Sequence, residues 1–418
     1  MPYLSRFRTI SSVPREPPAM TKLISLLILA LAEILVLSLW FSATAVAPQI
    51  AAEFALTPLQ QGMLTSAVIA GFVIGCLVSA LLNLADRLEP RLFFAVSSVL
   101  GAAANLAFLA VDAGSPGAVG LRLATGAVMA GVYPIGMKIA VSWARNDAGL
   151  LVGFLVAALT VGSATPYLFA FSGGADWRVV LTAGSAAALI GAVAIGFVKV
   201  GPNFRKSGTF DVRRAFDTWR DPAIRLANFG YYGHMWELYA VWAGISFYLT
   251  ASFERAGMEE AIAFGRLAGF SAIAAGFFGA LLGGYLADKI GRTALTIASL
   301  TVSGLCCLAA GPLFGASPAI VITLALVWGI AVIADSAQFS TSVAELAEPG
   351  SQGTMLTTQN AVGFAIALIS VQLLPVWVAA VGWEWAFAPL VVGPVFGILA
   401  MARLRGRPEA VKLAGGRR

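Results

Sequence analysis

Long apolar segments separated by short polar ones make up most of the chain. Each segment has about 20 residues or more, the length that an α-helix needs to cross a hydrocarbon layer about 30 Å thick. Membrane-spanning strands would instead be short and would alternate between apolar and polar positions. The pattern predicts an all-α integral membrane protein with twelve transmembrane helices, at residues 23–47, 62–83, 92–112, 117–143, 149–171, 178–200, 223–251, 264–287, 293–313, 318–342, 353–378 and 384–404.

The longest polar connection divides these spans into two sets of six. Residues 201–222 are rich in Arg and Asp and lie between the sixth and seventh predicted spans. We therefore predict two pseudo-symmetric six-helix bundles, at residues 23–200 and 223–404, joined by a cytoplasmic loop at 201–222. Residues 1–22 and 405–418 are predicted to be cytoplasmic tails.

The composition supports a membrane protein and argues against a soluble enzyme. Apolar residues make up 59% of the 418 positions and charged residues only 11%, whereas soluble domains carry about 25% charged residues. The three cysteines all lie in apolar segments and the chain has a single histidine. Neither a disulfide framework nor a metal site is expected from such a set, and no cofactor is predicted.

The positive charges are distributed in a way that predicts the orientation in the membrane. Of the 27 Lys and Arg residues, most lie in the segments on the same side as the N-terminus, and only Arg178, Arg255 and Arg266 lie in those on the other side. Cytoplasmic loops of membrane proteins carry such an excess, so both termini are predicted to be cytoplasmic. We interpret the net charge of +6 as orientation and contact with anionic lipid rather than nucleic-acid binding.

A related motif follows the second span of each half. The second half contains GGYLADKIGR and the first half LNLADRLEPR, each in a short loop that turns one helix into the next. Glycine permits a tight turn, and an acidic residue near the start of the following helix interacts favourably with its positive end. A well-capped turn and a conformational switch are both open interpretations of these loops, whose candidate residues are Asp86, Arg87, Gly284, Asp288, Lys289, Gly291 and Arg292.

The pattern G-x-x-x-D-[RK]-x-G-[RK] in this loop resembles the signature of the major facilitator superfamily. The second-half copy matches it in full, whereas Leu82 and Glu89 replace both glycines in the first half. Arg122 followed by Gly126 resembles a second signature of that family, and its antiporter motif is partly present as Gly162 and Pro166. The stretch VYPIGMKIAVSWAR is loosely similar to bacterial cyanate and nitrate permeases. The resemblance implies alternating-access transport, switch loops and a monomer in the bacterial inner membrane.

Six ionisable residues lie at membrane depth, and all fall in the first, fourth, seventh and tenth spans. A charge in hydrocarbon is costly, so such residues usually face a cavity or a partner. We expect these four helices to enclose one polar space, and the family resemblance places the same helices around a central cavity. The residues are Glu33, Arg122, Lys138, His234, Glu237 and Asp335.

Their chemistry suggests roles in proton and substrate binding. Glu33 and Glu237 are candidate proton-coupling sites, assisted by His234, one turn before Glu237, and by Arg122, although structural pairing would also account for them. The candidate substrate ligands are Arg122, Asp335, Gln338, Trp40 and Tyr133.

We therefore predict a secondary active transporter, a symporter that moves a small organic or inorganic anion or a zwitterion together with protons. Its partners would be this solute, protons and the lipid bilayer. The alternative is a proton-driven efflux antiporter for drugs or metabolites. Three other classes of membrane protein are not favoured by the sequence. We find no output domain of the kind a membrane sensor needs and no phosphate-binding loop of the kind an ATP-driven pump needs. We also find no catalytic constellation for an intramembrane enzyme.

Overall fold

The computed structural model describes residues 19–144, 148–172, 176–204, 217–348 and 351–418, and throughout these ranges every regular element is helical. The first half contains α1 (Ala19–Leu37), η1 (Thr44–Val46), α2 (Ala47–Phe54), α3 (Pro58–Leu82), α4 (Leu84–Arg87), α5 (Pro90–Ala107), η2 (Phe108–Ala110), α6 (Pro116–Met129), α7 (Tyr133–Val141), α8 (Ala148–Ser172), α9 (Trp177–Ala194) and η3 (Ile195–Phe197). The second half contains α11 (Asp217–Arg220), α12 (Pro222–Arg255), α13 (Ala261–Ala274), α14 (Gly276–Ile290), α15 (Arg292–Ala309), α16 (Pro318–Ala334), α17 (Ser336–Leu346), α18 (Gln352–Trp385), η4 (Ala388–Val391), α19 (Val392–Arg405) and η5 (Pro408–Gly416).

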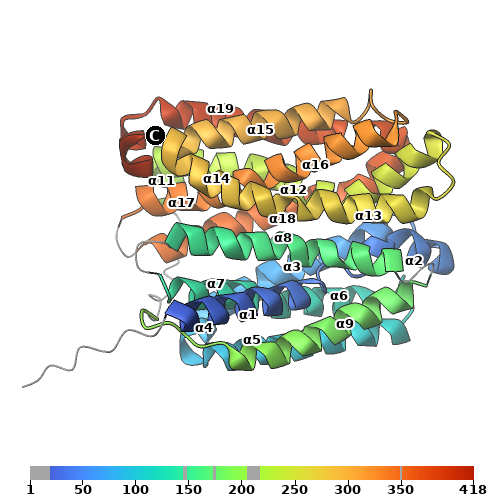
Figure 1. Cartoon of the computed structure of the whole chain (residues 1–418), viewed down its shortest axis with the longest axis horizontal. Coiled ribbons are helices and arrows are strands. Elements are labelled where there is room, and N and C mark those ends of the chain that lie inside the picture. Colours follow the sequence, from blue (N-terminus) through green and yellow to red (C-terminus); the bar gives the residue numbers. More distant parts are fainter. Residues whose placement is uncertain (1–18, 145–147, 173–175, 205–216, 349–350) are drawn as a thin grey trace, which may run out of the picture.

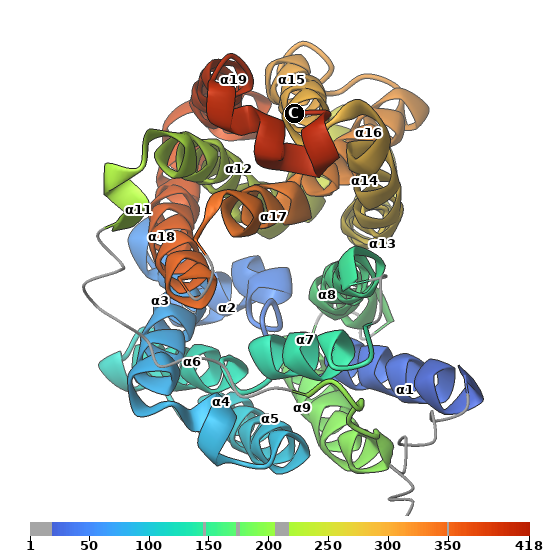
Figure 2. The same ribbon diagram turned by 90° about the vertical axis from the view of Figure 1, so that its left-hand side faces the viewer.

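The long helices run roughly along one axis and form two bundles, one from each half of the chain (Figure 1). Seen along that axis, the bundles meet where α18 lies beside α3 and where α8 lies beside α13 and α14 (Figure 2). We call the end that carries α4, the start of α1 and the C-terminus the terminal face, and the opposite end, which carries α2, the far face.

Eleven of the described helical segments are long and apolar enough to cross a membrane. The twelfth span is α12, a 34-residue helix that is less apolar and carries His234, Glu237 and several Tyr and Trp residues. Every predicted span overlaps one of these segments, which confirms the all-α architecture with two six-helix bundles. The predicted tail at residues 1–18 and the loop residues 205–216 lie outside the described part of the chain.

Polar caps and prolines set where several helices begin. Thr57 caps α3 by accepting a hydrogen bond from the Gln60 backbone, while the Gln60 side chain accepts from the Thr57 backbone. Asp221 caps α12 in the same way, accepting from two backbone N–H groups immediately after Pro222 at the first position. These side chains satisfy N–H groups that lack partners within the helix.

Four of the spans are interrupted near their middle. The first span leaves the helix after Leu37 and passes through turns into η1, and the fourth is broken between α6 and α7 just before Pro134, which cannot donate a backbone hydrogen bond. The eighth is broken at Ala275 and the tenth at Asp335. Each of these four spans also carries a buried ionisable residue, whereas α12 carries His234 and Glu237 within an unbroken helix.

The turn between the second and third spans of each half is made by different residues in the two halves. In the second half Gly291 has a φ of 95°, and a Cβ there would lie 2.1 Å from the carbonyl oxygen of Arg418, so only glycine fits. In the first half Asn83 takes the left-handed conformation, with a φ of 57°, and Glu89 caps α5 by accepting from the Leu92 N–H. Glu89 thus has a structural use at the position where the motif has glycine.

Candidate functional site

Glu33 is the most isolated of the buried carboxylates. Its side chain is fully buried, and neither carboxylate oxygen has a hydrogen-bond partner. The carboxylate lies against α7, where a Cβ at Gly136 would fall 1.9 Å from Oε1. Tyr133 lies one turn earlier on α7. Glu33 is therefore held between the first and fourth spans.

Glu237 lies in a very different environment. It is fully buried inside the second bundle, where Oε1 accepts hydrogen bonds from Trp328 Nε1 at 2.6 Å, from Cys307 Sγ at 3.4 Å and from the Ser303 hydroxyl. These donors come from α15 and α16. Only Oε2 lacks a partner. The two candidate proton-coupling residues, Glu33 and Glu237, thus differ in their hydrogen bonding.

His234 and Asp335 form a buried pair within the second bundle. Nδ1 of His234 lies 3.1 Å from Oδ1 of Asp335, and both side chains are about 1% exposed. His234 Nε2 has no hydrogen-bond partner, and its ring stacks against Tyr231 with centroids 6.1 Å apart. The break at Asp335 places its carboxylate opposite α12. His234 therefore contacts Asp335, whereas Glu237 one turn away contacts other groups.

Arg122 is fully buried, and its guanidinium is bonded on every nitrogen. Nε donates to the carbonyl of Leu64 at 3.0 Å, Nη2 donates to the carbonyl of Trp40 at 3.0 Å, and Nη1 donates to Asn105 Oδ1 at 3.0 Å and to Ser42 Oγ at 3.3 Å. All four acceptors are neutral and belong to the first bundle. Arg122 therefore joins α3, α5 and the interrupted first span.

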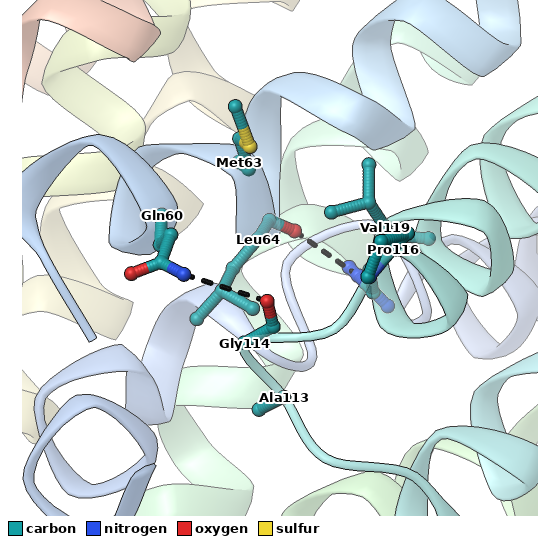
Figure 3. A pocket seen from close by; sticks show the side chains of 8 residues that line it. Gln60, Met63, Leu64, Ala113, Gly114, Pro116 and Val119 are labelled. Atoms are coloured by element: carbon teal, nitrogen blue, oxygen red, sulfur yellow. Dashed lines mark hydrogen bonds between the residues drawn. The ribbon is translucent and has the colours of Figure 1, made fainter. Parts of the chain in front are cut away.

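Arg122 also borders a cavity of about 390 Å³ between the starts of α3 and α6 (Figure 3). Gln60 Nε2 reaches across its mouth to the carbonyl of Gly114, at 3.4 Å. All the residues that line this cavity belong to the first bundle. Lys138 lies on the other side of the break, toward the terminal face, where Nζ donates to the carbonyl of Ala85 at 3.1 Å.

An aromatic layer closes the junction between the bundles. Three rings come from the first bundle and three from the second, and the ring centroids of contacting pairs across the junction lie 4.8–6.3 Å apart. The indole N–H groups of Trp40 and Trp242 are buried without a partner. We define the aromatic layer as Trp40, Phe41, Phe72, Tyr239, Trp242 and Phe364.

Hydrogen bonds join the bundles on the far side of this layer. Gln372 of α18 accepts from Ser66 Oγ at 2.5 Å and donates to the carbonyl of Leu59 at 2.6 Å. Tyr167 donates to the carbonyl of Trp242 at 2.6 Å. The far half of the junction is thus held together on both sides of the molecule.

At the far face, Arg178 and Trp177 of α9 both donate to Glu53 of α2. The hydrogen bond from Arg178 lowers the pKa of Glu53 below its ordinary value. Helix α2, which follows the interrupted first span, is thereby fixed to α9.

Gln338 does not join the other predicted substrate ligands. Its Oε1 accepts a 2.7 Å hydrogen bond from Nη1 of Arg292, which also makes a two-pronged ion pair with Glu345, at 2.8 and 2.6 Å. Asp288 lies 3.6 Å from the same guanidinium. The switch-loop motif of the second half is therefore connected to the end of α17 through Glu345.

The C-terminal segment covers this network on the terminal face. Ala414 N–H donates to Glu345 Oε2 at 3.0 Å, Thr293 Oγ1 donates to the carbonyl of Arg418 at 3.1 Å, and Arg417 donates to the carbonyl of Asp288. Leu413 is fully buried. The predicted tail 405–418 is thus folded onto the second bundle.

The other switch residues differ in their surroundings. Lys289 Nζ lies 4.2 Å from the centroid of the Tyr285 ring, and a Cβ at Gly284 would meet nothing within 4 Å. Arg87 is exposed at the end of α4, which also contains Asp86. The Asp86 side chain lies outside the described part of the structure.

Sequence reasoning missed three partners that define these sites. Glu345 follows Gln338 by seven residues, two turns along one helix face, so the spacing did contain a signal for their common neighbour. Gly136 and Trp328 gave no such signal, because each meets its carboxylate from another helix.

The comparisons with known proteins agree with this architecture. The sequence profile of the Major Facilitator Superfamily matches residues 29–371, and no curated protein sequence matches the chain. A bacterial homologue of the human lysosomal transporter Spinster, in an inward-facing and unoccupied conformation, is 16% identical with a TM-score of 0.69, covering 93% of this chain and 97% of its own. The nucleoside transporter NupG is 14% identical with a TM-score of 0.70, covering 91% and 99%.

A partially occluded, inward-open structure of the xylose transporter XylE from E. coli is likewise 14% identical, with a TM-score of 0.70, and covers 92% of this chain and 98% of its own. Identities this low establish a common fold and leave the solute open. The profile match spans most of the chain, including the interrupted first and fourth spans. The chain therefore belongs to the Major Facilitator Superfamily and is a multi-pass membrane transporter rather than an enzyme.

Proposed function

We propose that the protein is a proton-coupled secondary transporter of a small solute, with Glu33 as the principal proton-binding group. The proposal rests on the observation that the Glu33 carboxylate is fully buried and that neither oxygen has a hydrogen-bond partner. An isolated ionised carboxylate is very costly away from water, so ionisation of Glu33 requires water, a cation or a rearrangement of the helices to reach it. Proton release at Glu33 would then be coupled to conformational change.

His234 and Asp335 supply the second part of this proposal. Their 3.1 Å contact lies in the opposite bundle, and Nε2 of His234 has no hydrogen-bond partner. A proton exchanged by this pair would alter the charge on the second bundle as Glu33 does on the first. Glu237, bonded by three donors, is assigned a structural role that holds α12, α15 and α16 together.

Alternating access is supported by the way in which the bundles touch. The aromatic layer and the Gln372 bonds close the far half of the junction. Transport requires this half to open while the terminal half closes, with each bundle moving as a unit. We propose that the Arg292–Glu345 network and the C-terminal segment stabilise the terminal face during this conformational change.

We assign Arg122 a positioning role rather than substrate binding. Its donors are engaged by four neutral acceptors of the first bundle, and it fixes the interrupted backbone at Trp40. The expected binding of an anion by Arg122 therefore has no support from its contacts. We further propose a monomer in a bacterial inner membrane with both termini cytoplasmic, on the basis of the distribution of positive charge.

Proteoliposomes that enclose a pH-sensitive dye test the proposal. They would be challenged in turn with solutes that cannot themselves carry protons across the lipid: a sugar, a nucleoside, choline, glycine betaine and a sulfonate. We expect at least one solute to drive a pH change in the wild type that is absent from protein-free liposomes and from Glu33→Gln. Glu259→Gln, the same change at an exposed turn, should behave as the wild type. A flat dye signal for every solute would exclude proton coupling.

A further inference from the structure

The side chains around the junction favour a positively charged solute. We propose that the substrate is an organic cation, an amine or quaternary ammonium attached to an apolar group, which binds between Glu33 and the aromatic layer. This inference rests on the proposed transport function and replaces the anion or zwitterion expected from the sequence.

The first argument is the inventory of charge inside the spans. In the described spans three basic side chains lie there, and each is engaged by acceptors of the protein: Arg122 by its four acceptors, Lys138 by the carbonyl of Ala85, and Arg266 of α13 by the carbonyl of Ala170 on α8, at 2.7 Å across the junction. His234 faces Asp335. An anion entering the junction would therefore have to compete for a cation that already has a partner.

The second argument is that the negative charge is available. Both oxygens of Glu33 are buried without a hydrogen-bond donor, so an ammonium group that reached them would supply the missing donors and the opposite charge. Gly136 leaves room for the carboxylate itself, since a Cβ at that position would lie 1.9 Å from Oε1. Asp335 provides a second acidic group in the facing bundle.

The third argument is the chemistry of the aromatic layer. Trp40 follows Glu33 by seven residues, three positions beyond the end of α1 at Leu37, and its ring contacts Phe72, Tyr239 and Phe364 at 5.0, 5.8 and 6.0 Å. Indole and phenol rings attract cations through their faces, and aromatic cages of this kind bind quaternary ammonium groups. When the bundles part, this layer divides into two aromatic walls above a carboxylate.

The solute would place its ammonium group at Glu33 and its apolar group against the aromatic layer. The unpaired indole N–H groups of Trp40 and Trp242 would donate hydrogen bonds to a neutral oxygen or nitrogen of the same molecule. The site thus combines one charged contact, one apolar surface and two hydrogen-bond donors.

Three probes of similar shape and different charge test the proposal. The full-length protein in lipid nanodiscs would be titrated with benzyltrimethylammonium, benzenesulfonate and benzyl alcohol, and binding would be followed by intrinsic tryptophan fluorescence against empty nanodiscs. We expect the cation to bind at least tenfold more tightly than either of the other probes. Glu33→Gln should weaken binding of the cation at least tenfold and change the affinity for benzyl alcohol by less than twofold.

Two further variants keep the test decisive if Glu33→Gln folds poorly. Glu33→Asp retains the charge and should recover most of the affinity for the cation. Tyr239→Leu removes one ring of the aromatic layer and should weaken binding of the cation several-fold. Glu259→Gln should match the wild type. The proposal is overturned if the cation binds no more tightly than the other two probes, or if a folded Glu33→Gln variant binds it as the wild type does.

These titrations need no proton gradient, so they separate the two proposals. Preferential binding of benzenesulfonate together with solute-driven proton flux in the dye assay would retain proton-coupled transport and exclude a cationic substrate. Glu33-dependent binding of the cation without proton flux for any solute would retain the site and exclude proton coupling.

Discussion

The guanidinium of Arg122 donates a 3.0 Å hydrogen bond to the main-chain carbonyl of Trp40, at the point where the first span leaves its helix. Arg122→Ala would leave this carbonyl buried without a donor and would remove the hydrogen bonds to Leu64, Asn105 and Ser42. An unsatisfied buried group costs about 1–3 kcal/mol and a hydrogen bond to a charged group is worth about 1.5–3 kcal/mol, so we expect a loss of about 3 kcal/mol or more and a clearly lower melting temperature in detergent.

Arg122→Lys keeps the charge but lacks the planar set of donors, so its loss should be intermediate. Arg403→Ala removes an exposed arginine at the end of α19 and serves as the matched control. Equal melting temperatures for Arg122→Ala and Arg403→Ala would contradict the positioning role.

Gly136 is expected to be intolerant of any side chain, because a Cβ there would lie 1.9 Å from Glu33 Oε1. Gly136→Ala should destabilise the protein by about 1–3 kcal/mol, the usual cost of overpacking, and should impair proton flux. Combining it with Glu33→Ala should restore much of the stability, since the two groups then no longer overlap. Thermal melting of the two single variants and the double variant measures this coupling.

Gly284 provides the control for this experiment. It is also a helical glycine, but a Cβ there would meet nothing within 4 Å. Gly284→Ala should therefore be neutral or slightly stabilising, because alanine is favoured over glycine inside a helix by roughly 0.5–1 kcal/mol. A similar loss at both glycines would mean that the contact with Glu33 is not the cause.

Gln372 is predicted to hold the far half of the junction closed. Gln372→Ala removes two hydrogen bonds between the bundles, worth about 0.5–1.5 kcal/mol each, so the far-open population should rise roughly tenfold. Spin labels at the exposed positions Leu59 and Val381, with Cys76→Ser as background, would report a larger fraction of long distances.

Gln352 offers the comparison for Gln372, because its side chain donates to the carbonyl of Ala344 within one bundle. Gln352→Ala should leave the distance distribution between the labels unchanged. If Gln372→Ala also leaves it unchanged, these bonds do not control opening.

Glu345 should control how firmly the C-terminal segment is docked. Glu345→Gln removes a charged partner from Arg292 and weakens the bond from Ala414 N–H. Hydrogen bonds to charged groups are worth about 1.5–3 kcal/mol, so residues 408–418 should be cleaved faster by a protease and should exchange amide hydrogens faster. Glu348→Gln, at an exposed position three residues later, should change neither rate.

The sequence predicted the spans because membrane crossing requires long apolar helices, and this requirement is local to each segment. It also identified the buried ionisable residues, since any charge in such a segment is unusual. Glu33 and Glu237 could not be distinguished in this way. Both are acidic residues near the middle of a span, and they differ only in what the neighbouring helices bring to them: Trp328 and other donors for Glu237, and the bare backbone of Gly136 for Glu33.

Sequence alone therefore determined that this protein is a twelve-span transporter with acidic residues inside its first, seventh and tenth spans, because hydropathy and motif spacing are properties of the chain itself. The tertiary structure decided which of those charges are free to act. Arg122 looked like an anion ligand until its four neutral acceptors, drawn from three separate segments, were found around it. These hydrogen bonds depend on the distances between helices, and those distances cannot be read from the order of residues along one helix.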